Sequence, residues 1–178
     1  MAKYSSEKIR RMISESDNAP NSYIKGEKLE ELVRYIFDKV PGVSFYEKNI
    51  LDQGRTHEID LAFWNLQIQS QLSFLDPVII VECKNTGRAL GSSRVGWFVR
   101  KLQDSGVRYG ILVSLSGITG ESDSQSNAHS EILDAQKRDG IKILVIKRQE
   151  LFTLSTTNDL SSLLQRKILK LTLHKIAS

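Results

Sequence analysis

Residues 77–84 of the chain read Pro77-Val78-Ile79-Ile80-Val81-Glu82-Cys83-Lys84. The four residues after the proline are apolar on both faces, and the end of the segment is abruptly polar. A central strand of a sheet has this composition when helices cover both of its faces. The stretch therefore predicts a central strand whose last residues enter a functional site.

The residues after this strand alternate between extended and helical patterns. Their spacing predicts a helix over 91–104, a strand over 109–114, a helix over 127–139 and a strand over 141–147. A strand, a helix and a second strand in succession form a right-handed crossover, which pairs the two strands in parallel. This half of the chain is therefore typical of an α/β fold.

The residues before the central strand predict a helix over 26–40 and two strands over 43–50 and 57–64. A turn signal at residues 52–54 joins these strands as a hairpin. Residues 65–76 fit either a long connection or a strand extension. Hairpin-joined strands here and parallel strands later predict a mixed central β-sheet flanked by helices on both faces.

Length and composition favour one compact domain with two extensions. The chain has 178 residues, and a domain typically has roughly 100–200. We expect a polar N-terminal arm or short frayed helix over 1–25, an α/β domain over 26–155, and a C-terminal amphipathic helix over 156–178 that packs on the domain or extends it. The leucines and basic residues of this last helix favour packing or dimerisation over binding in a groove of nucleic acid.

The composition also excludes several classes of protein. Cys83 is the single cysteine, which excludes an internal disulfide and a zinc site built on paired cysteines. No segment approaches the roughly 18 apolar residues of a membrane span, and the first residues lack the pattern of a secretory signal. We therefore expect a soluble, cytoplasmic protein with no membrane partner. The net charge is only +4, but basic residues gather in the middle and at the end, which permits a polyanionic partner.

One group of residues has the composition of a catalytic site. Glu82 and Lys84 are two apart on the central strand and so share a face, while Asp60 lies on a polar face of the preceding strand. Two converging carboxylates are ligands for a hard divalent cation, and the backbone carbonyl of Cys83 is placed to add a neutral ligand. Lys84 beside such a cation could orient or deprotonate an attacking water. The alternative is a solvated ion pair at a strand end, with Asp60 as an ordinary surface acid.

Glu30 extends this group from the helix over 26–40. It lies at the margin of the apolar stripe of that helix, where a carboxylate can reach a neighbouring cleft. A plain acid on the helix surface is the alternative.

The order of these elements resembles the PD-(D/E)xK nuclease superfamily. That order is a helix with a marginal Glu, a strand with Asp, an apolar strand that ends in Glu-x-Lys, and then a helix and a strand. The second half is most similar to Mrr-type restriction endonucleases. The segments that carry this similarity are IVECKN (80–85), GILVS (110–114), SGIT (116–119) and GIKIL (140–144), within a resemblance that covers roughly residues 26 to 148.

The resemblance implies a restriction endonuclease-like fold and a site for cleavage of DNA. It implies metal ligation by Asp60 and Glu82, a catalytic Lys84 and a supporting carboxylate at Glu30, with Mg²⁺ as the cofactor and Mn²⁺ as a substitute. The residue before Asp60 is Ile59 rather than the proline of the motif. A chain with one such site needs a partner copy to cut both strands of a duplex, so we expect a homodimer.

Five residues after the predicted lysine are candidates for binding nucleic acid: Arg88, Arg94, Trp97, Arg100 and Lys101. Cations at this point would neutralise phosphates beside the scissile bond, and Trp97 could pack against a sugar or a base. The alternative is a buried Trp97 surrounded by arginines whose stems lie along apolar surface.

These observations predict a divalent-metal-dependent DNA endonuclease that hydrolyses phosphodiester bonds. Two alternatives keep the same fold: a non-catalytic nucleic-acid-binding module, and a nuclease for branched DNA or RNA. A structural subunit that dimerises through its last helix is a third. Cleavage that stops on addition of a chelator would separate the enzyme from the modules that only bind.

Overall fold

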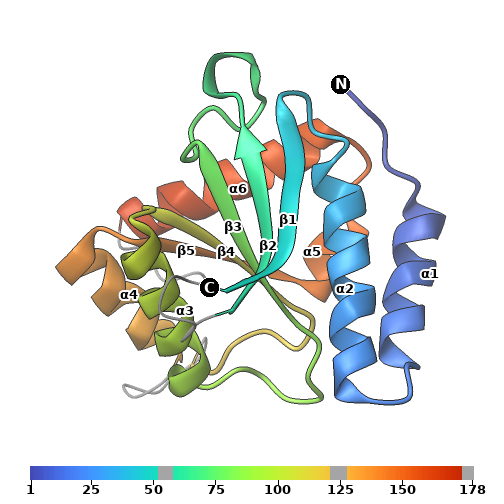
Figure 1. Ribbon diagram of the computed structural model, residues 1–178, viewed down its shortest axis with the longest axis horizontal. Helices are drawn as coiled ribbons and strands as arrows, with labels where there is room; N and C mark the ends of the chain where they lie inside the picture. Colours follow the sequence, from blue (N-terminus) through green and yellow to red (C-terminus); the bar gives the residue numbers. More distant parts are fainter. Residues whose placement is uncertain (52–57, 121–127, 174–178) are drawn as a thin grey trace.

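A computed structural model describes residues 1–51, 58–120 and 128–173 (Figure 1). Its centre is a five-stranded sheet with the order β1-β2-β3-β4-β5. The strands are β1 (Val43–Leu51), β2 (Glu58–Asn65), β3 (Val78–Lys84), β4 (Tyr109–Ser114) and β5 (Lys142–Lys147). β2 is antiparallel to both β1 and β3, whereas β3, β4 and β5 are parallel. The predicted mixed sheet is therefore confirmed.

Helices cover both faces of this sheet (Figure 1). One face packs against α1 (Ser6–Asp17), α2 (Ser22–Phe37), α5 (Arg148–Phe152) and α6 (Thr157–Thr172). The other face packs against α3 (Ser92–Ser105) and α4 (Ala128–Asp139). α6 crosses behind the strands in Figure 1 and ends near α4. In this three-layer arrangement, the polar residues of β3 lie at its carboxyl end.

The alternation of side chains along β3 separates two hydrophobic cores. Ile79, Val81 and Cys83 belong to the core on the α1 and α2 side. Ile80 belongs to the core on the α3 and α4 side. Ile79, Ile80 and Val81 are buried, so Glu82 and Lys84 are the first polar residues of β3 on the face toward α3.

α3 lies close to the sheet because β4 contains a glycine beneath it. A Cβ atom on Gly110 would collide with Leu102 and Phe98 of α3. Val95, Phe98, Val99 and Leu102 are buried, as the predicted apolar face of this helix requires. The helix ends at Gly106, which is in the left-handed conformation with φ 67°.

The first and last helices of the described chain, α1 and α6, both pack on the domain. The sequence predicts an arm or a short frayed helix near the N-terminus; the structure has a 12-residue helix, α1, whose first turn is capped by the side chain of Ser5. Ile9 and Ile13 lie one turn apart on α1 and are buried, which fixes the helix to the core. At the other end, α6 buries Leu160, Leu163 and Leu164.

Residues 65–76 form a connection rather than a strand extension. The side-chain amide of Asn65 donates to the carbonyls of Leu72 at 3.0 Å and Asp76 at 3.1 Å, which satisfies the interior of this loop. A short 3₁₀ helix, η1 (Gln67–Gln69), opens it.

The predicted turn at 52–54, His57 and residues 121–127 and 174–178 lie outside the described residues. Within the ranges that are described, no helix has both the length and the apolar character needed to cross a bilayer.

Candidate active site

The predicted acids meet where β2 begins and β3 ends. Leu61 of β2 pairs with Val81 of β3, which brings Asp60 beside the end of β3. The Oδ2 atom of Asp60 accepts a hydrogen bond of 2.8 Å from the backbone N–H of Cys83. The backbone of the central strand thus fixes the orientation of this carboxylate.

Lys84 lies between the two acids. Its Nζ atom is 3.0 Å from Oδ2 of Asp60 and 2.8 Å from Oε1 of Glu82. Glu82 and Lys84 share one face of β3, because they are two residues apart on a strand. The three groups predicted to meet are therefore in contact, with the ammonium of Lys84 between the carboxylates of Asp60 and Glu82.

A second lysine binds Glu82 from the opposite side. The Nζ atom of Lys101 on α3 lies 2.7 Å from Oε2 of Glu82, and its side chain is only 11% exposed. The sequence placed Lys101 among residues that bind nucleic acid at the surface. The structure places it within the acid cluster, where each oxygen of Glu82 faces one ammonium.

Glu30 approaches the cluster from α2. Its Oε2 atom is buried and has no hydrogen-bond partner among the described residues. Burial, together with the negative charge of Asp60, raises the pKa of the Glu30 carboxyl to about 7. Glu30 therefore exchanges its proton near neutral pH, unlike an ordinary surface acid.

The charges around Lys84 keep it protonated in this arrangement. Burial acts to lower its pKa, but Glu82 and Asp60 attract and hydrogen-bond the ammonium and raise the pKa above the ordinary value of 10.5. Lys84 can act as a base only when another cation takes its place between the acids.

The donor set of the cluster fits a hard divalent cation. Within the described part of the chain, no group of three or more His, Cys, Asp or Glu side chains is already arranged as a metal site. However, Asp60 and Glu82 hold the Lys84 ammonium, itself a cation, between them. Glu30 adds a buried oxygen without a partner among the described residues. These are oxygen donors, which Mg²⁺ prefers. The thiol of Cys83 is buried in the core, and ligation by its carbonyl stays a prediction.

The remaining residues predicted to bind nucleic acid lie on α3 and in the loop between β3 and α3. Arg88, Arg94 and Arg100 are exposed, and Trp97 is 49% exposed rather than buried. The guanidinium of Arg100 lies 5.5 Å from the centre of the Trp97 ring. Their contact with nucleic acid stays a prediction.

Sequence reasoning missed a polar cluster that ties α1 to the strand ends, which we call the clasp: Ser16, Asp17, Asn85 and Arg148. Asn85, which follows Lys84, donates from Nδ2 to Oγ of Ser16 at 2.7 Å and to Oδ1 of Asp17 at 3.3 Å. Arg148 donates to both oxygens of Asp17, at 2.6 Å and 2.9 Å. The clasp therefore fixes the backbone directly after Lys84. No local pattern could reveal it, because its hydrogen bonds join residues 68, 69 and 131 positions apart.

Comparison with known proteins agrees with this geometry. The family model of the Mrr catalytic domain, described as a restriction endonuclease, matches residues 22–154. The matched region contains Glu30, Asp60, Glu82 and Lys84, whereas α1 and α6 lie outside it. No curated protein matches the chain.

Proposed function

The chain belongs to the Mrr-type restriction endonuclease family, and on this premise we propose that it is a divalent-metal-dependent endonuclease that hydrolyses phosphodiester bonds in DNA. The observation that carries the proposal is the position of the Lys84 ammonium between Asp60 and Glu82 at the end of the central strand. A structural ion pair would not require a second lysine and a protonatable Glu30 at the same point.

Asp60 and Glu82 would hold the metal ion, with the Cys83 carbonyl as a further ligand. A bound Mg²⁺ would polarise the scissile phosphate and lower the pKa of a coordinated water. The backbone N–H of Cys83 keeps the Asp60 carboxylate aimed at the site throughout. Lys101 neutralises the Oε2 atom of Glu82 and holds that side chain in position.

Lys84 would orient the attacking water and take its proton as a neutral amine. Asp60 and Glu82 hold its ammonium in the present arrangement, and a metal ion bound between these acids would remove the contacts that keep it protonated. Glu30 supports this transfer, because a carboxyl with a pKa of about 7 both accepts and releases a proton near neutral pH.

DNA would bind over the exposed surface of α3 and the loop before it. Arg88, Arg94 and Arg100 supply positive charge for phosphates, and the half-exposed Trp97 supplies an aromatic surface. Cleavage of both strands would involve a second copy of the chain, since one chain carries one such cluster among its described residues.

Supercoiled plasmid incubated with Mg²⁺ or Mn²⁺, with and without chelator, tests this function. We expect nicking that the chelator abolishes. Lys84→Ala should bind DNA but cleave it at least about 1,000-fold more slowly, because proton transfer and positioning are both lost. Lys137→Ala, at an exposed position on α4, is the matched control and should cleave normally.

The same assay separates the alternatives. Chelator-insensitive binding without turnover would identify a non-catalytic module and contradict the proposal. Labelled duplex, branched DNA and RNA substrates, compared side by side, identify the preferred nucleic acid.

A further inference from the structure

The ammonium of Lys101 has a fixed position in the candidate active site. Val99 and Leu102, which flank this residue on α3, are buried in the core between the helix and the sheet. The side chain of Lys101 is 11% exposed, and its Nζ atom lies 2.7 Å from Oε2 of Glu82. Burial leaves a long side chain few alternative rotamers. Lys101 therefore stays at this oxygen as long as α3 is packed on the sheet.

Lys84 binds the same acid but is less enclosed. It is the last residue of β3, and its side chain is 24% exposed. Its Nζ atom lies 2.8 Å from Oε1 of Glu82 and 3.0 Å from Oδ2 of Asp60. This is the position between two carboxylates that a divalent cation would take. The two oxygens of Glu82 therefore differ: Oε1 faces a lysine that a metal ion can displace, and Oε2 faces a lysine that stays.

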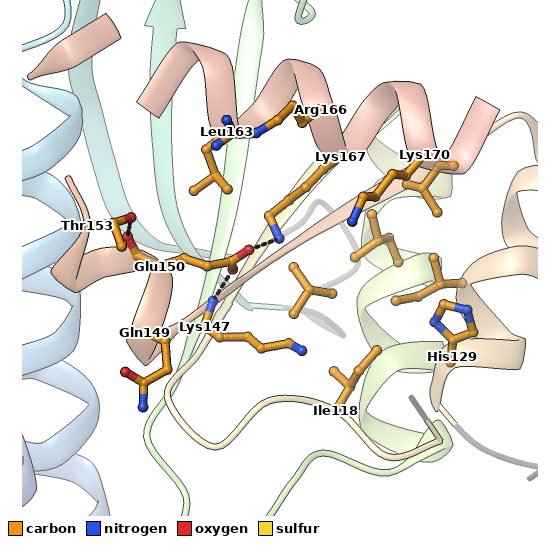
Figure 2. A pocket seen from close by; sticks show the side chains of 14 residues that line it. Ile118, His129, Lys147, Gln149, Glu150, Thr153, Leu163, Arg166, Lys167 and Lys170 are labelled. Atoms are coloured by element: carbon orange, nitrogen blue, oxygen red, sulfur yellow. Dashed lines mark hydrogen bonds and ion pairs between the residues drawn. The ribbon is translucent and has the colours of Figure 1, made fainter. Parts of the chain in front are cut away.

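The pair formed by Lys167 and Glu150 shows a structural contact between a helical lysine and an acid (Figure 2). The Nζ atom of Lys167 on α6 lies 2.5 Å from Oε1 of Glu150. The other oxygen of Glu150 accepts a bond of 2.8 Å from the backbone N–H of Lys147, which caps α5. Glu150 thus binds one lysine side chain and its own backbone. Glu82 instead binds two ammoniums that come from two different elements, which is more than a contact within the fold requires.

A carboxylate with one cation on each oxygen is the arrangement of a bridging ligand. In nucleases that use two metal ions, the ions lie about 3.5–4 Å apart, and a carboxylate that bridges them gives one oxygen to each. In this chain an ammonium lies at each oxygen of Glu82. An ion that displaced Lys84 would gain Oε1, while Oε2 would keep its bond to Lys101. Glu82 could then bind one ion but not bridge two.

We propose that Lys101 is a positioning residue that takes the place of a second metal ion, so that the site binds one divalent cation per chain. The inference rests on the metal site of the proposed function and adds to it the number of ions and the reason for that number. Lys101 acts through Glu82: it holds the side chain by Oε2 and leaves Oε1 for the metal ion. It also supplies, from the protein, positive charge that a second ion would otherwise supply.

Titration of the whole protein with Mn²⁺, followed by the electron paramagnetic resonance signal of the free ion, counts bound ions independently of cleavage. We expect one ion per chain in the wild type and in Lys101→Arg, which keeps the charge. Lys101→Met removes the ammonium and frees Oε2 of Glu82, so we expect two ions per chain. Lys167→Met makes the same change at the structural pair on α6 and is the matched control, which should bind one ion. Thermal unfolding confirms that each variant is folded.

The count in the wild type decides the inference even if Lys101→Met does not fold. Two ions in the wild type, or a single ion in folded Lys101→Met, would overturn it. DNA cleavage by a wild type that binds two ions would retain the proposed function and overturn the inference alone. One ion bound by a wild type that cuts no DNA would refute the proposed function and support the inference. A wild type that binds no Mn²⁺ would contradict both.

Discussion

Two charged clusters lie at the same end of the sheet, and they differ in how completely their acids are partnered. In the clasp, both oxygens of Asp17 receive hydrogen bonds from Arg148, and Asn85 adds a third. In the candidate active site, formed by Glu30, Asp60, Glu82 and Lys84, the buried Oε2 atom of Glu30 has no partner in the described structure. Hydrogen bonding by Arg148 lowers the pKa of Asp17, whereas burial raises that of Glu30.

Under the proposed function, this difference separates an acid that holds the fold from an acid that takes part in the chemistry. A satisfied carboxylate stabilises the folded state by remaining charged. A half-buried carboxyl with one unpartnered oxygen destabilises the folded state when it ionises, and it is retained where that oxygen serves a ligand. The following variants test this contrast, from the largest expected effect to the smallest.

Glu82→Gln should have the largest effect, on both activity and stability. Its carboxylate binds Lys84 and Lys101 in a largely buried site, so its neutralisation leaves these ammoniums under-compensated. We expect the free energy of unfolding in chelator to fall by about 3 kcal/mol and DNA cleavage to fall at least about 100-fold.

Denaturant unfolding and plasmid nicking measure these two losses. Glu47→Gln, exposed on β1, is the control, and Lys101→Met added to Glu82→Gln should restore part of the stability. A Glu82→Gln protein as stable as the wild type would mean that the cluster is solvated and ordinary.

Asp17→Asn should have an intermediate effect that appears mainly in kcat. Its contact with Arg148 is about one-third exposed, so its loss should cost only about 1 kcal/mol of stability. Asn85 would keep its bond to Ser16 but would lose its contact with a carboxylate that Arg148 holds in place, which would loosen the backbone after Lys84. We therefore expect kcat to fall about 10-fold with KM unchanged.

The kcat and KM values of Asp17→Asn are compared with those of Asp134→Asn, an exposed acid on α4. A change in KM alone would place the clasp on the binding surface rather than behind the catalytic strand.

The pH dependence of stability should show the smallest effect, with opposite signs for the two clusters. The pKa of Glu30 is raised from 4.5 to about 7, so the folded state binds the extra proton and stability falls as pH rises through this window. The pKa of Asp17 is lowered from 3.8, so its contribution is present above that value and is lost as pH falls below it.

Thermal unfolding in chelator at pH 5 and pH 8 checks the first of these signs. Glu30→Gln should gain Tm over the wild type at pH 8 and match it at pH 5. A difference in Tm between the two proteins that is the same at pH 5 and pH 8 would contradict the raised pKa of Glu30.

The sequence predicted the fold well where periodicity and order carry the information. Glu82 and Lys84 are two residues apart on a strand, which predicted that both lie on one face of β3. The alternation of strand and helix after Lys84 predicted parallel pairing. Asp60 followed from the order of the elements. The meeting of these groups is seen in the structure, while their roles in cleavage stay predictions.

The rest could not be predicted, because it depends on tertiary distance. Lys101 has the pattern of a surface cation on α3, and only the docking of that helix brings it to Glu82. α1 has just two buried isoleucines in a polar segment, which gives a weak periodic signal. The contact of Asp17 with Arg148 joins opposite ends of the chain.

The absence of a side chain at Gly110 has a consequence for evolution and for engineering. Lys101 reaches Glu82 because α3 packs directly on β4. The distance between this helix and the sheet is set by Gly110, which has no side chain. A methyl group at position 110 would lift the helix and withdraw the second lysine while every titratable group stayed in the chain. The reactivity of the cluster can thus be tuned by a steric change in the layer beneath it, out of reach of both solvent and substrate.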